Sequence, residues 1–450
     1  MDTSRREFGW LGILRLGLVQ TAIGAVVVLA TSTLNRVMIV EFALPATVPG
    51  ALVALHYAVQ LVRPRFGHGS DVGGRRTRWI LGGMALLAAG GTLASLATAL
   101  LGSQPALALS LALLAYTLIG LGVGAAGTSL LVLLATEVAP ERRAAAATVV
   151  WIMMIAGFAI TSGVAGSFLD PFSPVRLVAV VACASLLALG LAACAVLGIE
   201  RPRPGRLAER AFARGTAGFG AALRQVWAES RTRRFTVFVF VSMLAYSAQE
   251  LVLEPFGARV FGLTPGASAH LSGTMHAGAV AGMILVAIAA SVLRIGTLRG
   301  WVVGGCIGSA AVLCALALGG MSGRGWPLVP AVFALGATTG AFAVAAIGSM
   351  MELAGTARDG REGVRMGLWG GAQAVAFAVG GLAGTAAMDL TRHLFALPGP
   401  AYACVFAAEA VLFIAAARVA HAIEWSPSPR SGDPFRAMVI GVRDAEASPK

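Results

Sequence analysis

The stretch Gly67-His-Gly-Ser-Asp-Val-Gly-Gly-Arg-Arg76 separates two long apolar runs, at residues 46–63 and 79–101. Its glycines permit a tight turn, and its aspartate suits the start of the following helix. Each flanking run is close to the length of about 20 residues that a membrane-spanning helix needs. The stretch therefore predicts a pair of membrane helices joined by a short turn, with arginines that keep the turn in the cytoplasm.

The same alternation of apolar runs and polar turns continues along all 450 residues. Hydrophobic residues make up 57% of the chain and charged residues only 12%, which is too little charge for the surface of a soluble protein. The mean hydropathy is +0.81. We predict an all-α integral membrane protein with twelve spans, at residues 11–34, 46–63, 79–101, 106–136, 144–168, 175–198, 235–255, 270–293, 300–320, 328–351, 364–388 and 400–422.

The longest polar stretch divides the spans into two groups of six. We expect an N-terminal bundle at 1–198, a basic cytoplasmic linker at 199–234, a C-terminal bundle at 235–425 and a disordered tail at 426–450. Within the linker, Phe219–Trp227 has the pattern of an amphipathic helix at the membrane surface.

The distribution of basic residues sets the expected orientation. Most of the 34 Lys and Arg residues fall at the two ends and in every second connection. The other connections hold one arginine each: Arg36, Arg176, Arg259, Arg324 and Arg392. Lys and Arg accumulate in cytoplasmic loops, so both termini are expected on the cytoplasmic side. The membrane is expected to be a bacterial inner membrane. The net charge of +13 is then explained by loops that face anionic lipid, and no nucleic-acid partner is expected.

The turn after the second span resembles the signature loop of the major facilitator superfamily, G-x-x-x-D-[RK]-x-G-[RK]-[RK], except that Val72 replaces a basic residue. The resemblance implies a fold of two pseudo-symmetric six-helix bundles, with a loop that latches the bundles on the cytoplasmic side. The residues that match are Gly67, Asp71, Gly74, Arg75 and Arg76.

A narrower resemblance lies at the ends of the first and seventh spans. The strings T-L-N-R-V-M-I-V-E at Thr33–Glu41 and Q-E-L-V-L-E-P-F-G at Gln249–Gly257 are similar to the PucC/LhaA family of phototrophic bacteria, the bacteriochlorophyll delivery family. The resemblance implies an intracytoplasmic-membrane factor for assembly of light-harvesting complexes, which handles (bacterio)chlorophyll or its precursors. Light-harvesting polypeptides and bacteriochlorophyll synthesis enzymes are the implied protein partners. The turn at Gly67–Arg76 is more compact than in PucC and LhaA, which leaves open the antenna complex that is served.

Polar residues gather where the first and seventh spans end, on the side opposite the basic loops. Polar groups inside a membrane are costly and usually functional. These two spans are the first helices of the two halves, so we expect Arg36 to pair with Glu250 or Glu254 and close that face. Direct contact with a pigment is the competing interpretation. The expected latch consists of Asn35, Arg36, Glu41, Glu250 and Glu254.

The magnesium of a chlorophyll takes an axial nitrogen or oxygen ligand, and a neutral imidazole suits it. Two histidines fall within spans, one of them with a glutamine one turn later, and two further glutamines are weaker candidates, although a single histidine in a helix is more often a packing residue. The candidate pigment-binding residues are His56, Gln60, Gln249, His276 and Gln373.

The sequence lacks three motifs that are typical of nucleotide hydrolases, serine hydrolases and zinc proteases. No G-x-x-x-x-G-K-[ST], G-x-S-x-G or H-E-x-x-H sequence is present, so we predict no catalytic residues and no ATP hydrolysis. The five cysteines form no C-x-x-C pair, and we expect neither a structural metal nor a required cofactor, although bound bacteriochlorophyll remains open. The alternatives are a secondary transporter of a small molecule and a scaffold for biosynthetic enzymes.

Overall fold

The computed structural model describes residues 8–63, 76–139, 142–199, 219–293, 295–323, 325–356 and 362–423. In this part of the chain, eleven helices are long and apolar enough to cross a bilayer, and the shorter apolar helix Thr47–Val62 brings the number to twelve. The predicted twelve-helix membrane protein is confirmed. The signature turn up to Arg75 and the tail at 426–450 lie outside the described residues, whereas Arg76 is the first residue of a helix.

The first six spans are formed by α1 (Trp10–Val28) continued by the π-helix η1 (Leu29–Thr33) and α2 (Leu34–Val40), then α3 (Thr47–Val59) with the 3₁₀ turn η2 (Gln60–Val62), α5 (Arg76–Leu100), α6 (Pro105–Glu137), α7 (Arg143–Leu169) and α8 (Pro174–Val196). The second six are α11 (Ser230–Phe261), α12 (Pro265–Ile288) continued by the π-helix η4 (Ala289–Leu293), α13 (Leu298–Ser322), α14 (Leu328–Thr356), α15 (Glu362–Leu394) and α16 (Pro398–His421).

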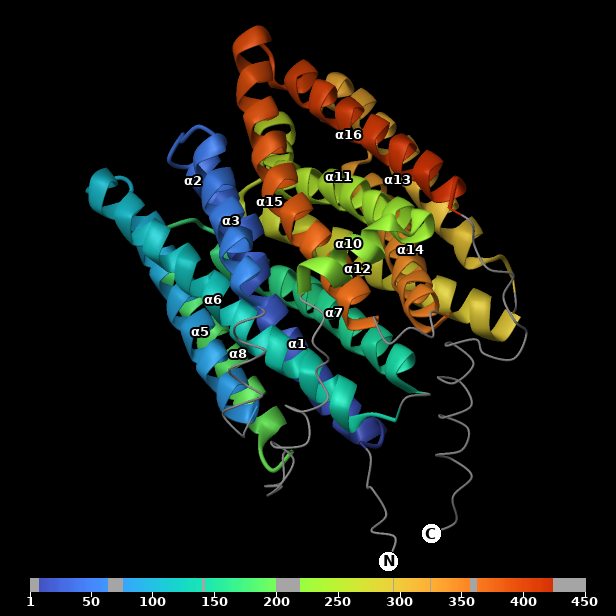
Figure 1. Cartoon of the computed structure of the whole chain (residues 1–450). Helices are drawn as coiled ribbons and strands as arrows, with labels where there is room; N and C mark the ends of the chain where they lie inside the picture. Colours follow the sequence, from blue (N-terminus) through green and yellow to red (C-terminus); the bar gives the residue numbers. More distant parts are fainter. Residues whose placement is uncertain are drawn as a thin grey trace, which may run out of the picture.

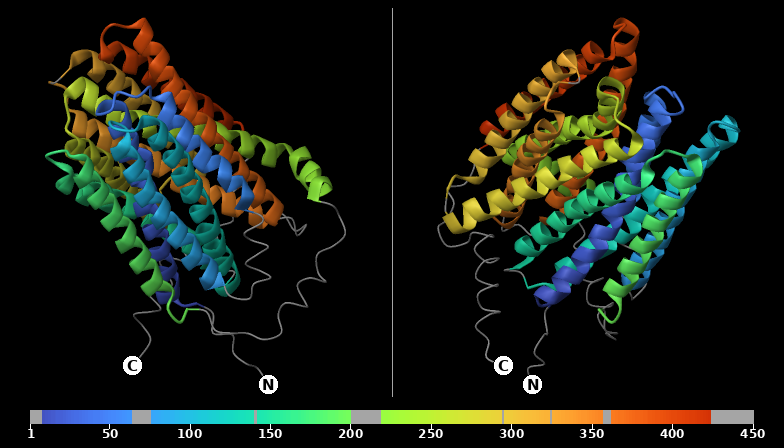
Figure 2. Two further views of the ribbon diagram at one scale, coloured as in Figure 1. Left: turned by 90° about the vertical axis from the view of Figure 1, so that its left-hand side faces the viewer. Right: turned by 180° about the vertical axis from the view of Figure 1, so that it is seen from behind.

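The two sets of six helices form two groups that lie side by side, blue to green and lime to red in Figures 1 and 2. The groups meet mainly where α7 packs on α12, where α3 packs on α15, and where the end of the first span packs on α11. We call the end of the molecule where α1 begins and α16 finishes the terminal end, and the other end the opposite end. Since successive helices alternate in direction, the helices that flank the basic connections begin or finish at the terminal end.

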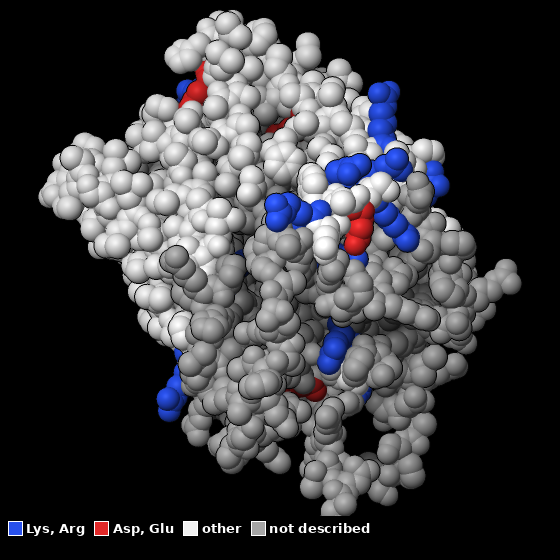
Figure 3. Space-filling model, in the orientation of Figure 1, with Lys and Arg blue, Asp and Glu red and all other residues white. Residues whose placement is uncertain are grey.

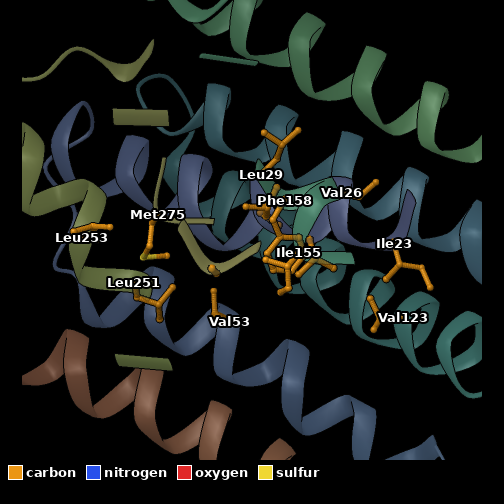
Figure 4. Packing of buried hydrophobic residues seen from close by; sticks show 14 of the residues in the cluster. Ile23, Val26, Leu29, Val53, Val123, Ile155, Phe158, Leu251, Leu253 and Met275 are labelled. Carbon is orange, nitrogen blue, oxygen red and sulfur yellow. The ribbon is translucent and has the colours of Figure 1, made fainter. Parts of the chain in front are cut away.

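A single cluster of buried apolar side chains runs through both groups. Figure 4 shows part of it, where side chains from α1, α3, α6 and α7 lie near others from α11 and α12. The labelled residues are Ile23, Val26, Leu29, Val53, Val123, Ile155, Phe158, Leu251, Leu253 and Met275. A shared apolar core therefore extends across the contact between the halves.

The expected amphipathic helix is present as α10 (Phe219–Ala228), but the linker is shorter than predicted because α11 already begins at Ser230. Glu229 precedes that start, and its carboxylate accepts hydrogen bonds from Arg365 Nε at 3.1 Å and from Thr232 Oγ1 at 2.8 Å. This pair fastens the start of α11 to α15. Lys and Arg side chains gather around α10 and the start of α11 in Figure 3, while the upper part of that face carries little charge.

Glycines bring α12 and α14 into close contact. A Cβ atom added at Gly336 would lie 1.9 Å from Met275 O, and one at Gly340 would lie 2.1 Å from Ala279 O. The facing glycines of α12, Gly278 and Gly282, meet α14 backbone in the same way. Small residues at such spacing let helices approach in a membrane, so this helix pair depends on the absence of side chains.

We predict that Gly336→Ala destabilises the protein, because the new methyl group overlaps a backbone carbonyl that cannot turn away. Overpacking of this kind costs about 1–3 kcal/mol. The matched control is Gly304→Ala in α13, where no atom of the described residues lies within 4 Å of the added Cβ and the change should be neutral or slightly stabilising. Thermal unfolding of the detergent-purified variants measures both effects, and equal midpoints would contradict the prediction.

Candidate functional site at the interface between the halves

A proline in α11 creates the first contact between the halves. Pro255 lies inside this helix and has no N–H group, so the carbonyl of Leu251 four residues earlier loses its helical partner. The side chain of Asn35 from α2 supplies one instead, since its Nδ2 donates to Leu251 O at 2.8 Å. Both Asn35 and Pro255 are buried. The first and seventh spans are thus joined by a hydrogen bond that the sequence of α11 makes necessary.

Glu254, beside that proline, is bound by a serine of the first span, which in turn contacts a serine of α12. Ser32 Oγ donates to Glu254 Oε1 and lies 3.1 Å from Ser272 Oγ of α12. Ser32 belongs to the π-helix η1, and single π-helical turns often occur at functional sites. Glu254 is 1% exposed, and its Oε2 has no hydrogen-bond partner among the described residues. One carboxylate oxygen is therefore held by Ser32, and the other has capacity for a further donor.

Arg36 does not pair with Glu250 or Glu254 as the sequence suggested. Its Nη1 donates to Glu41, five residues later, and its Nη2 donates to Leu263 O at 3.0 Å. Gly262, with a φ of 73°, ends α11 and turns the chain so that this carbonyl meets Arg36. Arg259 strengthens the same junction by donating to Ile39 O at 2.7 Å.

Two aspartates outside the predicted set join the halves at the same end. Asp389 of α15 accepts from the N–H groups of Ala46 and Thr47 at 2.9 and 2.8 Å, and from Thr47 Oγ1 at 2.6 Å. Asp170, just after α7, accepts from Thr264 Oγ1 at 2.5 Å and from the N–H of Gly266 at 3.1 Å. Each carboxylate thus caps the first turn of a helix in the other half.

The arrangement of these two caps is symmetric. The fifth span of the first half, α7, leads to the aspartate that caps the second span of the second half, α12. The fifth span of the second half, α15, carries the aspartate that caps the second span of the first half, α3. We call Asp170 and Asp389 the paired caps.

Among the pigment-binding candidates, His56 and Gln60 lie together. Gln60 Nε2 is 2.9 Å from His56 Nε2, and Gln60 Oε1 accepts from Arg63. An arginine can only donate, so the oxygen of Gln60 must face Arg63 and its NH₂ group must donate to His56. His56 therefore uses its Nε2 lone pair in this bond and carries its proton on Nδ1, for which the described residues offer no partner.

His276 has the opposite arrangement. Its Nδ1 lies 2.9 Å from Ser272 O, so this nitrogen carries the proton, and its buried Nε2 has no partner within the described ranges. The ring is fully buried in α12, with its centroid 5.0 Å from that of Phe158 in α7. A metal-binding histidine commonly donates its other nitrogen to a carbonyl in this way. Of the two histidines, His276 is the one with a lone pair available to a metal.

The remaining candidates are not brought to these histidines. Gln249 is fully buried, and neither of its amide atoms is paired with a described residue. It is two helical turns from Phe256, which contacts Tyr402 and Phe406 of α16, so it faces α16 within its own half. Gln373 Nε2 makes a 3.8 Å contact with Met243 Sδ, also within that half.

An aromatic group that the sequence analysis missed spans the halves near Glu250. The ring of Phe377 in α15 lies 4.9 Å from that of Tyr57 in α3 and 5.9 Å from that of Tyr246 in α11. Glu250 lies near both tyrosines and Thr31. All three rings pack against one another and remain partly exposed.

We predict that Asn35→Ala destabilises the protein by about 1–3 kcal/mol, because it leaves the buried carbonyl of Leu251 unpaired. In a Pro255→Ala background the same change should cost less, since the alanine introduced there can donate its own N–H to that carbonyl. A double-mutant cycle on thermal unfolding measures the difference. Thr33→Val, which removes a buried hydroxyl with no partner in the described part of the chain, is the control. An identical cost of Asn35→Ala in both backgrounds would refute the coupling.

Comparison with solved structures shows the fold. A bacterial homolog of the human lysosomal transporter Spinster, in an inward-facing and unoccupied conformation, aligns over 95% of this chain and 100% of its own with a TM-score of 0.62 and 16% identity. The peptide transporter POT in complex with sulfate aligns over 96% and 98%, with a TM-score of 0.65 and 15% identity. The predicted major facilitator fold is confirmed.

Comparison of sequences shows the family. The "Bacteriochlorophyll synthase 44.5 kDa chain" of Rhodobacter capsulatus is 54% identical over 92% of this chain and 95% of its own length. "Protein PucC" of the same species is 28% identical over 92% of each chain, and that of Cereibacter sphaeroides is 29% identical over 88% of each. The model of the family described as "PUCC protein" matches residues 33–426. That match begins at the junction of the first and seventh spans and takes in every helix that follows, so this chain belongs to the PucC family.

Proposed function

We propose that this protein is a non-enzymatic assembly factor of the photosynthetic membrane, which holds or delivers (bacterio)chlorophyll or a precursor while light-harvesting complexes are built. The apolar interior between the halves carries the proposal. A carrier of a large apolar pigment needs apolar side chains with a few fixed polar groups among them, and the side chains that the two halves bring together are of this kind. The relatives named PucC, and the relative named as a bacteriochlorophyll synthase chain, support the same role.

The orientation and partners belong to the same proposal. With both termini in the cytoplasm, the basic region around α10 would face the anionic inner leaflet and be accessible to cytoplasmic biosynthetic enzymes. The printed name of the 54% identical relative favours an association with pigment synthesis. A secondary transporter is the second candidate, favoured by the fold shared with Spinster and POT and by the buried carboxyls of Glu250 and Glu254 between the halves.

A deletion strain of the phototrophic host separates these two candidates. We expect reduced near-infrared absorption of assembled antenna complexes in the deletion strain and co-purification of pigment with the tagged protein from pigment-replete cells. Growth and pigment synthesis under identical light serve as the reference. Normal antenna assembly together with a colourless protein would refute the assembly role and favour transport.

We predict that His276→Phe lowers the amount of co-purified pigment more than His56→Phe does. The Nε2 lone pair of His276 is not used by any described residue, and that of His56 is used by Gln60, so only the first can bind magnesium without breaking an existing bond. The measurement is the ratio of near-infrared to protein absorbance after purification. Equal ratios in the two variants would remove His276 as the axial ligand.

A further inference from the structure

Arg63, which follows η2, has no anionic partner in the described part of the chain. Its Nη2 donates to Gln60, while its Nε is buried with no acceptor. No carboxylate of the described residues lies within ion-pair distance of it. A half-buried guanidinium at the membrane is costly unless a counter-charge or hydrogen-bond acceptors satisfy it, so this residue has unused capacity for an anion.

One side chain, that of Gln60, positions Arg63. His56, Gln60 and Arg63 follow one another at helical spacing, and the Gln60 side chain bonds to both of the others. A guanidinium braced in this way loses less side-chain freedom when it binds a carboxylate with two parallel hydrogen bonds. Arg78, which is exposed at the same end of the molecule, provides a comparison outside this group.

An aromatic surface adjoins this cation. Tyr57 is on the same helix and contacts Phe377 across the halves, and Phe377 in turn contacts Tyr246. Glu250 is one turn beyond Tyr246 toward the opposite end, whereas Arg63 is toward the terminal end. The tyrosines thus lie between the acidic and basic groups, and a ligand on the rings would meet the positive group only at its terminal side.

We infer that Arg63, braced by Gln60, binds the carboxylate of an amphipathic ligand whose apolar ring system lies against Tyr57, Phe377 and Tyr246. This inference rests on the proposed function, and it specifies the class of pigment. The ligand is a tetrapyrrole with a free carboxylate, rather than one whose carboxylate is esterified to a long alcohol. An ester has no negative charge for the guanidinium and would leave Arg63 unpaired in the complex.

The test is a titration of the full-length protein in lipid nanodiscs with chlorophyllide a, its methyl ester and chlorophyll a, followed by pigment fluorescence. The first two ligands differ only in one methyl group and the charge that it removes. We expect chlorophyllide a to bind the wild-type protein at least about tenfold more tightly than the methyl ester, since removing one partner of a buried charge pair costs at least this much.

The variants locate the effect at this residue. Arg63→Gln should abolish the preference for the free carboxylate, Arg63→Lys should retain part of it, and Arg78→Gln should bind like the wild type. Phe377→Leu should weaken the binding of all three ligands but leave the preference for the free carboxylate intact, because it removes an aromatic contact and no charge. The Lys and Leu variants keep the test informative if Arg63→Gln does not fold.

The two kinds of failure are distinguishable. Equal affinity of the wild-type protein for all three ligands, or an unchanged preference in Arg63→Gln, would overturn the role of Arg63 and leave the proposed function standing. Absence of binding by any of the three pigments would overturn both.

Discussion

A hydrocarbon environment offers no hydrogen-bond partner, so each backbone and side-chain polar group within the membrane must be satisfied by the protein. This constraint produces the twelve helices, and it also explains where the halves join. Pro255 leaves one carbonyl of α11 without its helical donor, and Asn35 of the other half supplies the missing bond. The N–H groups at the start of α3 and at the start of α12 have no helical acceptor, and they donate hydrogen bonds to the carboxylates of Asp389 and Asp170. These polar groups, which neither half can satisfy alone, join the halves in addition to the apolar core that they share.

Between these polar contacts the interior is apolar, and this contrast is the basis of the functional proposal. The serine of η1 binds one oxygen of Glu254 and is itself in contact with the serine of α12, and the imidazole of His276 is fixed by a backbone carbonyl. Such groups provide a few oriented polar contacts in a hydrocarbon-lined interior. That combination suits a large, mostly apolar pigment better than a hydrated ion or a sugar.

The sequence predicted the spans well, because hydropathy over about 20 residues reflects the bilayer directly. It also located the junction of the first and seventh spans, since polar residues stand out in apolar runs. It assigned the wrong partner to Arg36, because the direction of that side chain depends on the π-helix η1 and on the left-handed turn at Gly262. The paired caps, Asp170 and Asp389, were missed because their acceptor role depends on helix starts in the other half, which no local pattern reveals. Tyr57 and Phe377 carry no charge to distinguish them from packing residues.

The symmetry of the paired caps has a mechanical consequence. Each cap joins the fifth span of one half to the second span of the other, so a movement that parts the halves evenly at this end stretches both caps together. Breaking either one exposes a carboxylate and the amide groups of a helix start at the same moment. Separation of the halves at this end is therefore cooperative, with both caps released together. The free energy that holds this end closed is shared between the two symmetry-related caps.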